Sequence, residues 1–174
     1  VLVCGGVNAE GMHLQTTELV NLDGRAEAEG TPKGGLEGKK MKFKRSGVCM
    51  VKHGNAAYAF GGFDGKDPVR FAEVLQAGES GWGRCEGEWR EVHGFKEGRY
   101  GAAGVSIGGR VVIFGGFSGE KVLSSAMAFT PDGDDACTGG VGKMQPIGDM
   151  SIGRMAHAAC VYDGKAVVIG GTTG

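Results

Sequence analysis

The chain lacks a charge excess of either sign. Nineteen lysines and arginines stand against 20 aspartates and glutamates, which gives a net charge of −1. A protein that binds a phosphate backbone needs a strongly positive field, so we expect no nucleic-acid partner. No apolar run approaches the roughly 20 residues that span a bilayer, so we expect no membrane-spanning segment.

Paired cysteines are also lacking. The five cysteines have no CxxC or other paired spacing; they are Cys4, Cys49, Cys85, Cys137 and Cys160. Reduced thiols in a cytoplasmic, intracellular protein are the simplest interpretation. Cys85 and Cys137 fall in equivalent glycine-rich loops, which leaves a disulfide or a metal clip as an alternative, although four ligands of suitable spacing are missing.

Glycine, in contrast, is abundant, with 36 residues. Four glycine pairs end apolar runs at intervals of 56, 54 and 55 residues; they are Gly5-Gly6, Gly61-Gly62, Gly115-Gly116 and Gly170-Gly171. A period near this length is typical of tandem repeats, because one unit cannot bury its apolar face alone and must stack on a neighbour. We therefore expect a repeat protein in which the glycine pairs are structural positions.

Other residues recur at fixed offsets before each pair. An arginine stands sixteen residues before the first glycine and an apolar residue four positions earlier: Arg45 with Met41, Arg99 with Phe95, Arg154 with Met150. Six and seven residues before the pair lie dipeptides that tolerate positive φ: Gly54-Asn55, Gly108-Gly109 and Asp163-Gly164. Each dipeptide predicts a two-residue hairpin with a type I′ turn.

The segments around these turns predict four strands per repeat. Short apolar runs predict buried inner strands at 46–52 with 56–60, 102–107 with 111–114, and 156–162 with 166–169. A third strand follows each glycine pair after a polar loop, at 17–22, 71–77 and 124–130. A weaker fourth strand is marked by Trp89 with Val92 and by Met144 with Ile147. Four antiparallel strands per repeat are typical of a propeller blade, so we expect an all-β fold.

Two segments carry an arginine that opens the innermost strand and a hydrophobic run into a double glycine: GRYGAAGVSIGGRVVIFGG at 98–116 and GRMAHAACVYDGKAVVIGG at 153–171. In these marks the chain resembles the kelch-repeat family, which implies a kelch-type β-propeller. We assign 1–40 to the end of one blade, 41–94 to a second, 95–149 to a third and 150–174 to the start of a fourth. Because both chain ends fall inside a second strand, we expect residues 1–174 to be a partial propeller, a fragment of a parent with six or seven blades.

Antiparallel strand order places the loops after the glycine pairs and the loops that lead into the first strands on one face. Arg45, Arg99 and Arg154 are then expected to form part of a cationic ring that binds a carboxylate or phosphate group. The alternative is architectural: each arginine pairs with an acidic group such as Glu18 or Glu73 and ties blade to blade. Residues of the post-glycine loops differ more between repeats and are expected to contribute to binding: Asn8, Asp64, Lys66, Ser118 and Lys121.

Kelch-like proteins commonly act as scaffolds or substrate adaptors, so the resemblance implies a protein–protein interaction module. Its partner would be a protein or peptide, acidic or phosphorylated, bound on the face described above. The alternative is an enzyme or its accessory platform, because galactose oxidases and sialic-acid epimerases also resemble kelch propellers and a propeller can be appended to a tRNA-modifying methyltransferase. Histidines and tyrosines show no recognisable triad or copper set, so we expect no catalytic residue, cofactor or metal.

Overall fold

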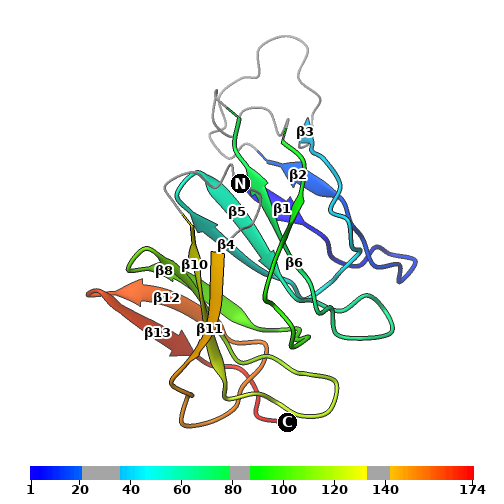
Figure 1. Cartoon of the computed structure of the whole chain (residues 1–174). Coiled ribbons are helices and arrows are strands. Elements are labelled where there is room, and N and C mark those ends of the chain that lie inside the picture. The colour runs from blue at the N-terminus through cyan, green and yellow to red at the C-terminus, as the bar shows by residue number, and fades with distance from the viewer. Residues whose placement is uncertain (21–35, 79–86, 133–141) are drawn as a thin grey trace.

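The computed structural model describes residues 1–20, 36–78, 87–132 and 142–174. Within these ranges the regular structure is β-sheet, in four antiparallel sheets that follow one another in chain order (Figure 1). The two middle sheets have four strands each, so the predicted all-β fold of four-stranded antiparallel blades is confirmed.

The strands pair with their neighbours in the chain in every sheet. The first sheet contains β1 (Leu2–Cys4), β2 (Thr17–Leu19) and β3 (Leu36–Glu37). The second contains β4 (Cys49–His53), β5 (Ala56–Phe60), β6 (Ala72–Gln76) and β7 (Arg90–Val92). The third contains β8 (Ala103–Ile107), β9 (Arg110–Phe114), β10 (Ala126–Pro131) and β11 (Gly142–Ile147). The last contains β12 (Ala158–Tyr162) and β13 (Lys165–Ile169).

The three predicted hairpins have two-residue turns, but one turn type was predicted wrongly. Both central residues have positive φ at Gly108-Gly109 and at Asp163-Gly164, as a type I′ turn requires. At Gly54-Asn55 only Gly54, at φ 54°, is left-handed. Glycine at the first central position with ordinary φ at the second is the pattern of a type II′ turn, which gives the flanking strands a similar twist.

The innermost strands begin one to three residues later than the sequence predicted, because a left-handed residue precedes each. Gly47, Gly101 and Ala156 stand two residues after the repeated arginine, at φ 55°, 64° and 52°. The Gly101 N–H donates to the Gly47 carbonyl at 2.9 Å, and the Ala156 N–H donates to the Gly101 carbonyl at 2.7 Å. These bends therefore link neighbouring blades through their backbones.

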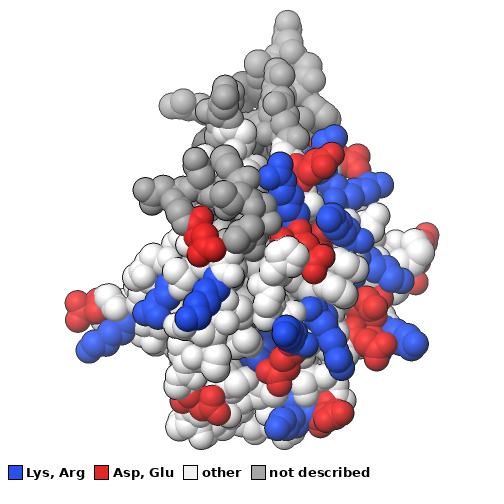
Figure 2. Space-filling view, viewed as in Figure 1, with Lys and Arg blue, Asp and Glu red and all other residues white. Residues whose placement is uncertain are grey.

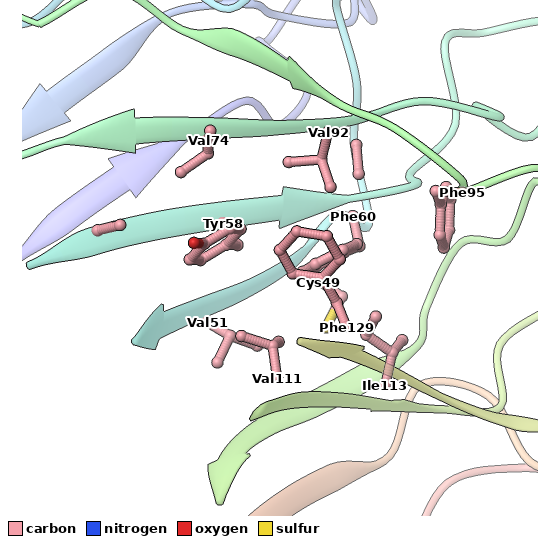
Figure 3. Close-up of a cluster of buried hydrophobic side chains, with 12 residues drawn as sticks. Cys49, Val51, Tyr58, Phe60, Val74, Val92, Phe95, Val111, Ile113 and Phe129 are labelled. Atoms are coloured by element: carbon pink, nitrogen blue, oxygen red, sulfur yellow. The ribbon is translucent and has the colours of Figure 1, made fainter. Parts of the chain in front are cut away.

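The core lies between the sheets. Because alternate side chains of a strand point to opposite faces, the central strand β5 packs against both neighbouring blades and is buried along its whole length. Tyr58 and Phe60 face the third sheet, where they meet Val111, Ile113 and Phe129 (Figure 3). Ala59 instead belongs to the cluster that packs against the first sheet. Each blade thus buries its apolar face only by stacking on the next.

The apolar residue four positions before each arginine fills the space between blades. Met41 packs against the first sheet, Phe95 joins the cluster between the second and third sheets, and Met150 packs against the cluster of the third and fourth. Trp89 adds a polar tie, since its indole Nε1–H donates to the Thr17 Oγ1 at 3.2 Å and the Lys39 carbonyl at 3.0 Å. The repeated box is therefore an inter-blade packing element.

Several other features bear on the sequence predictions. No helix among the described residues could cross a membrane. Burial raises the pKa of the Cys49 thiol to about 12, so this cysteine behaves as a small core residue. Cys85 and Cys137 lie outside the described residues.

His157 is expected to make the free energy of unfolding depend on pH. It lies beside Gly115 and Gly171 and has Val48 and Ala102 at its offset in the other repeats. Burial, and then Arg154, lower its pKa below the ordinary 6.5, against a smaller opposing effect of the Phe114 carbonyl. The folded state therefore favours the neutral ring. As the pH falls, the ring is protonated in the unfolded chain before it is protonated in the folded protein. The free energy of unfolding therefore decreases as the pH falls below 6.5.

We expect His157→Val to flatten the pH dependence of the free energy of unfolding between about pH 6.5 and 5, since the unfolded His titrates there. Urea titrations of both proteins across this range measure the slope. An unchanged slope in the variant would contradict the assignment to His157.

Candidate functional site

The repeated arginines connect each blade to itself and to the preceding blade. The Nη1–H of Arg45, Arg99 and Arg154 donates to the carbonyl of the first glycine of its own blade, at 2.8, 3.0 and 2.6 Å. The carbonyl of each arginine in turn accepts the N–H of the second glycine of the preceding blade, at 2.9, 2.8 and 2.9 Å, from Gly6, Gly62 and Gly116. One residue thereby fixes two glycine pairs.

In the second blade the arginine is sealed inside the protein. The Arg45 Nη2–H donates to the Glu73 carboxylate at 2.6 Å, and neither side chain is exposed. The other Glu73 oxygen accepts the Lys42 N–H at 2.8 Å. Burial lowers the pKa of Arg45, and the opposite charge of Glu73 opposes this. Phe43 covers the guanidinium, with its ring centroid 5.8 Å from the Arg45 Cζ.

In the third blade the counter-charge comes from a different position. Met127 stands where the second blade has Glu73, and its sulfur lies 3.6 Å from the Arg99 Nη2. The Arg99 Nη2–H pairs with Glu97, whose side chain is 47% exposed. Ser125 Oγ accepts from the same nitrogen at 3.1 Å. The Arg99 Nε–H is buried without a hydrogen-bond partner.

The expected ring of accessible cations is not what the described residues form. Arg45 and Arg99 are fully buried, and Arg154 is half-buried. The reason is that each guanidinium donates to the carbonyl of a glycine pair, where neighbouring blades are in contact. The geometry favours the architectural alternative for Arg45, with Glu73 as its acid, although the pair lies within one blade and the backbone carbonyl makes the connection between blades.

Asn8, Asp64 and Ser118 occupy the same position, two residues after each glycine pair, and shape the post-glycine loops. Each side-chain oxygen accepts two backbone N–H groups of its own loop: Glu10 and Met12 for Asn8, Lys66 and Asp67 for Asp64, and Glu120 and Lys121 for Ser118. The bonds from Asp67 and then Lys66 lower the pKa of Asp64. These residues hold the loops in similar conformations and keep an anion at Asp64.

A groove of about 780 Å³ lies between the loops of the second and third blades. Its aromatic part is formed by Phe43 and Phe71, whose rings stack with centroids 4.4 Å apart and planes 3° apart. Phe71 is 40% exposed. Solvent-exposed aromatic rings in a concave surface are typical of sites that anchor a partner.

The groove is lined by charged groups of both signs. Cations come from the leading loop of the second blade and the residue before Phe71: Lys42, Lys44 and Arg70. Anions come from the post-glycine loops: Asp64, Asp67 and Glu120. Figure 2 shows charges of both signs gathered on the side of the molecule where these loops project in Figure 1. The groove therefore fits a partner that carries both charges.

The groove contains only part of the predicted site. Of the five predicted loop residues, Asp64 and Ser118 line it, whereas Asn8, Lys66 and Lys121 do not. Sequence reasoning missed Phe43 and Phe71. A signal was available: at these two positions the third repeat has Glu97 and Ser125, so the aromatic pair is specific to the second repeat. Residues that break the repeat were better indicators than residues that keep it.

Among the described residues no group of three or more histidines, cysteines or carboxylates could hold a metal ion. The tyrosines are placed apart: Tyr58 is in the core, Tyr100 lies between Phe63 and Phe117, and Tyr162 is exposed.

The comparison with known families agrees with the architecture. Residues 98–134 match the family model described as the Kelch motif. This segment contains the third-blade arginine, its hairpin, its glycine pair and β10. No match was found among the curated proteins. The matched motif in one repeat, with the same arginine–glycine geometry in its neighbours, supports a kelch-type repeat in this chain.

Proposed function

We propose that the chain is a protein-interaction module that binds a peptide segment of another protein in the groove between the second and third blades. The kelch motif suggests an interaction propeller in general. The observation that carries the specific proposal is the Phe43–Phe71 stack, with Phe71 exposed, in a groove lined by both cations and anions. A fold alone does not define a partner, so the groove has to supply the chemistry.

The groove fits an extended segment with an apolar side chain over Phe71 and acidic groups toward Lys42, Lys44 and Arg70. The carboxylates of Asp64, Asp67 and Glu120 suit a basic residue of the same segment. Matched charges of this kind steer association and fix register more than they add affinity. A cytoplasmic, intracellular location and the absence of catalysis stay predictions from the sequence.

Selection of peptides from a random displayed library tests the proposal. We expect Phe71→Ala to weaken the selected peptides at least about tenfold, since loss of a central aromatic anchor typically costs 2 kcal/mol or more. Arg70→Glu should weaken those that contain acidic residues. The matched control is Arg110→Glu at the start of β9, beside the hairpin turn and outside the groove.

Equal loss of binding in Arg70→Glu and Arg110→Glu would contradict the groove as the site, because it would assign the effect to net charge. Binding that survives Phe71→Ala unchanged would contradict the aromatic anchor.

A further inference from the structure

We propose that Arg99 is a concealed receptor for a carboxylate of the bound peptide, and that Glu97 occupies this receptor until the peptide displaces it. This inference rests on the proposed function, because it concerns the same face of the molecule. Gly98, between the two residues, packs directly against Pro68 and Arg70 of the groove.

The two complete blades differ at the positions that surround the arginine. In the second blade the acid is buried in strand β6, Phe43 covers the guanidinium, and Phe71 stacks on Phe43. In the third blade the corresponding residues are Met127, Glu97 and Ser125. In the third blade the acid that pairs with the arginine is therefore in the leading loop instead of the core, and its side chain is about half exposed. Arg45 is therefore permanently neutralised, whereas the partner of Arg99 can swing into water.

The hydrogen bonds of Arg99 leave one edge incomplete. Its Nη1 is used by the Gly115 and Ser125 carbonyls, at 3.0 and 3.2 Å. Glu97 pairs with Nη2 alone, and Nε has no acceptor. The Nε–Nη2 edge of a guanidinium binds a carboxylate through two parallel bonds, which is stronger than one. A carboxylate that approaches from the groove can accept from both nitrogens, so no buried donor stays unpaired. Glu97 accepts from Nη2 only and leaves the Nε–H unpaired.

Removal of Glu97 should then favour an acidic ligand. We use a fluorescent hexaglutamate peptide as the probe and expect Glu97→Gln to tighten its binding about threefold or more, because the internal competitor is lost. Glu10→Gln is the control: it removes the same charge from an exposed residue in the first post-glycine loop of the same face. A matched phosphoserine peptide in a glutamine background distinguishes a phosphate from a carboxylate as the preferred group.

A direct readout is the ¹⁵N resonance of the Arg99 Nε–H, which should shift and exchange more slowly with water when hexaglutamate is added. This measurement does not depend on a variant of Arg99, whose side chain is fully buried. An equal gain in hexaglutamate affinity in Glu97→Gln and Glu10→Gln would contradict the proposal that Arg99 is the receptor. An unchanged Arg99 Nε–H resonance would contradict it as well. Tighter binding of the phosphoserine peptide alone would overturn the choice of a carboxylate.

Failure here is distinguishable from failure of the proposed function. If peptides from the library still depend on Phe71 and Arg70 while Glu97→Gln changes nothing, the groove stands and the Arg99 receptor does not.

Discussion

Replacing Glu73 by glutamine is expected to lower the free energy of unfolding by about 3–5 kcal/mol, because a buried cation is left without its counter-charge. Arg45 and Glu73 are both fully buried, 2.6 Å apart. In a domain of this size each kcal/mol lowers the melting temperature by roughly 2–4 °C, so a fall of roughly 6 °C or more should appear in a thermal melt.

Glu97→Gln is the matched control, since it removes the acid from the equivalent arginine of the next blade. Its carboxylate is half exposed, so water can replace it and the loss should stay below about 1 kcal/mol. Urea titrations of both variants give the two free energies. Similar losses would contradict the distinction between a buried and an exposed acidic partner on which the Arg99 proposal depends.

Gly61→Ala is expected to cause the second large effect, a loss of several kcal/mol in the free energy of unfolding. Gly61 has φ 62°, and a Cβ at this position would overlap the Arg99 carbonyl oxygen. That oxygen accepts the Gly62 N–H at 2.8 Å, so neither group can move without breaking the connection between blades. Strain at a fixed backbone contact belongs to the mechanisms that give the largest mutational losses.

Gly108→Ala is the control that separates the cost of the contact with the Arg99 carbonyl from the cost of the left-handed conformation. Gly108 has φ 57° in its hairpin turn, but no atom lies within 4 Å of where its Cβ would be. The left-handed conformation alone costs roughly 1–2 kcal/mol. The difference between the two variants in urea denaturation therefore measures the blade-to-blade contact. If Gly61→Ala yields no folded protein while Gly108→Ala does, the expectation is met; equal losses would contradict it.

The repeat and the strands were predictable because their causes are local. Glycine pairs, turn dipeptides and apolar runs stand at fixed offsets, and each acts on residues a few positions away. The hairpin Ala56–Phe60 with Cys49–His53 needed nothing else. The late start of the inner strands was missed, because the left-handed residues Gly47 and Ala156 bond with a neighbouring blade. No local pattern marks that choice at an alanine.

The candidate site was less predictable because it depends on burial and on residues far apart in the chain. Three arginines at one offset suggested a common role, yet their acids come from different positions, Glu73 in a strand and Glu97 in a loop. Phe43 and Phe71 meet only because their loops share a face. A sequence shows that a charge recurs; it does not show whether water reaches it.

The most direct test of the account is to map where a selected peptide binds, by backbone amide chemical-shift changes in the ¹⁵N-labelled chain. We predict the largest changes in the leading loop around Phe43, at Arg70 and Phe71, and in the loop from Ser118 to Lys121. The hairpin turns at Gly54, Gly108 and Gly164 on the opposite face should stay unchanged. Changes concentrated at those turns would contradict the claim that the post-glycine face is the binding surface.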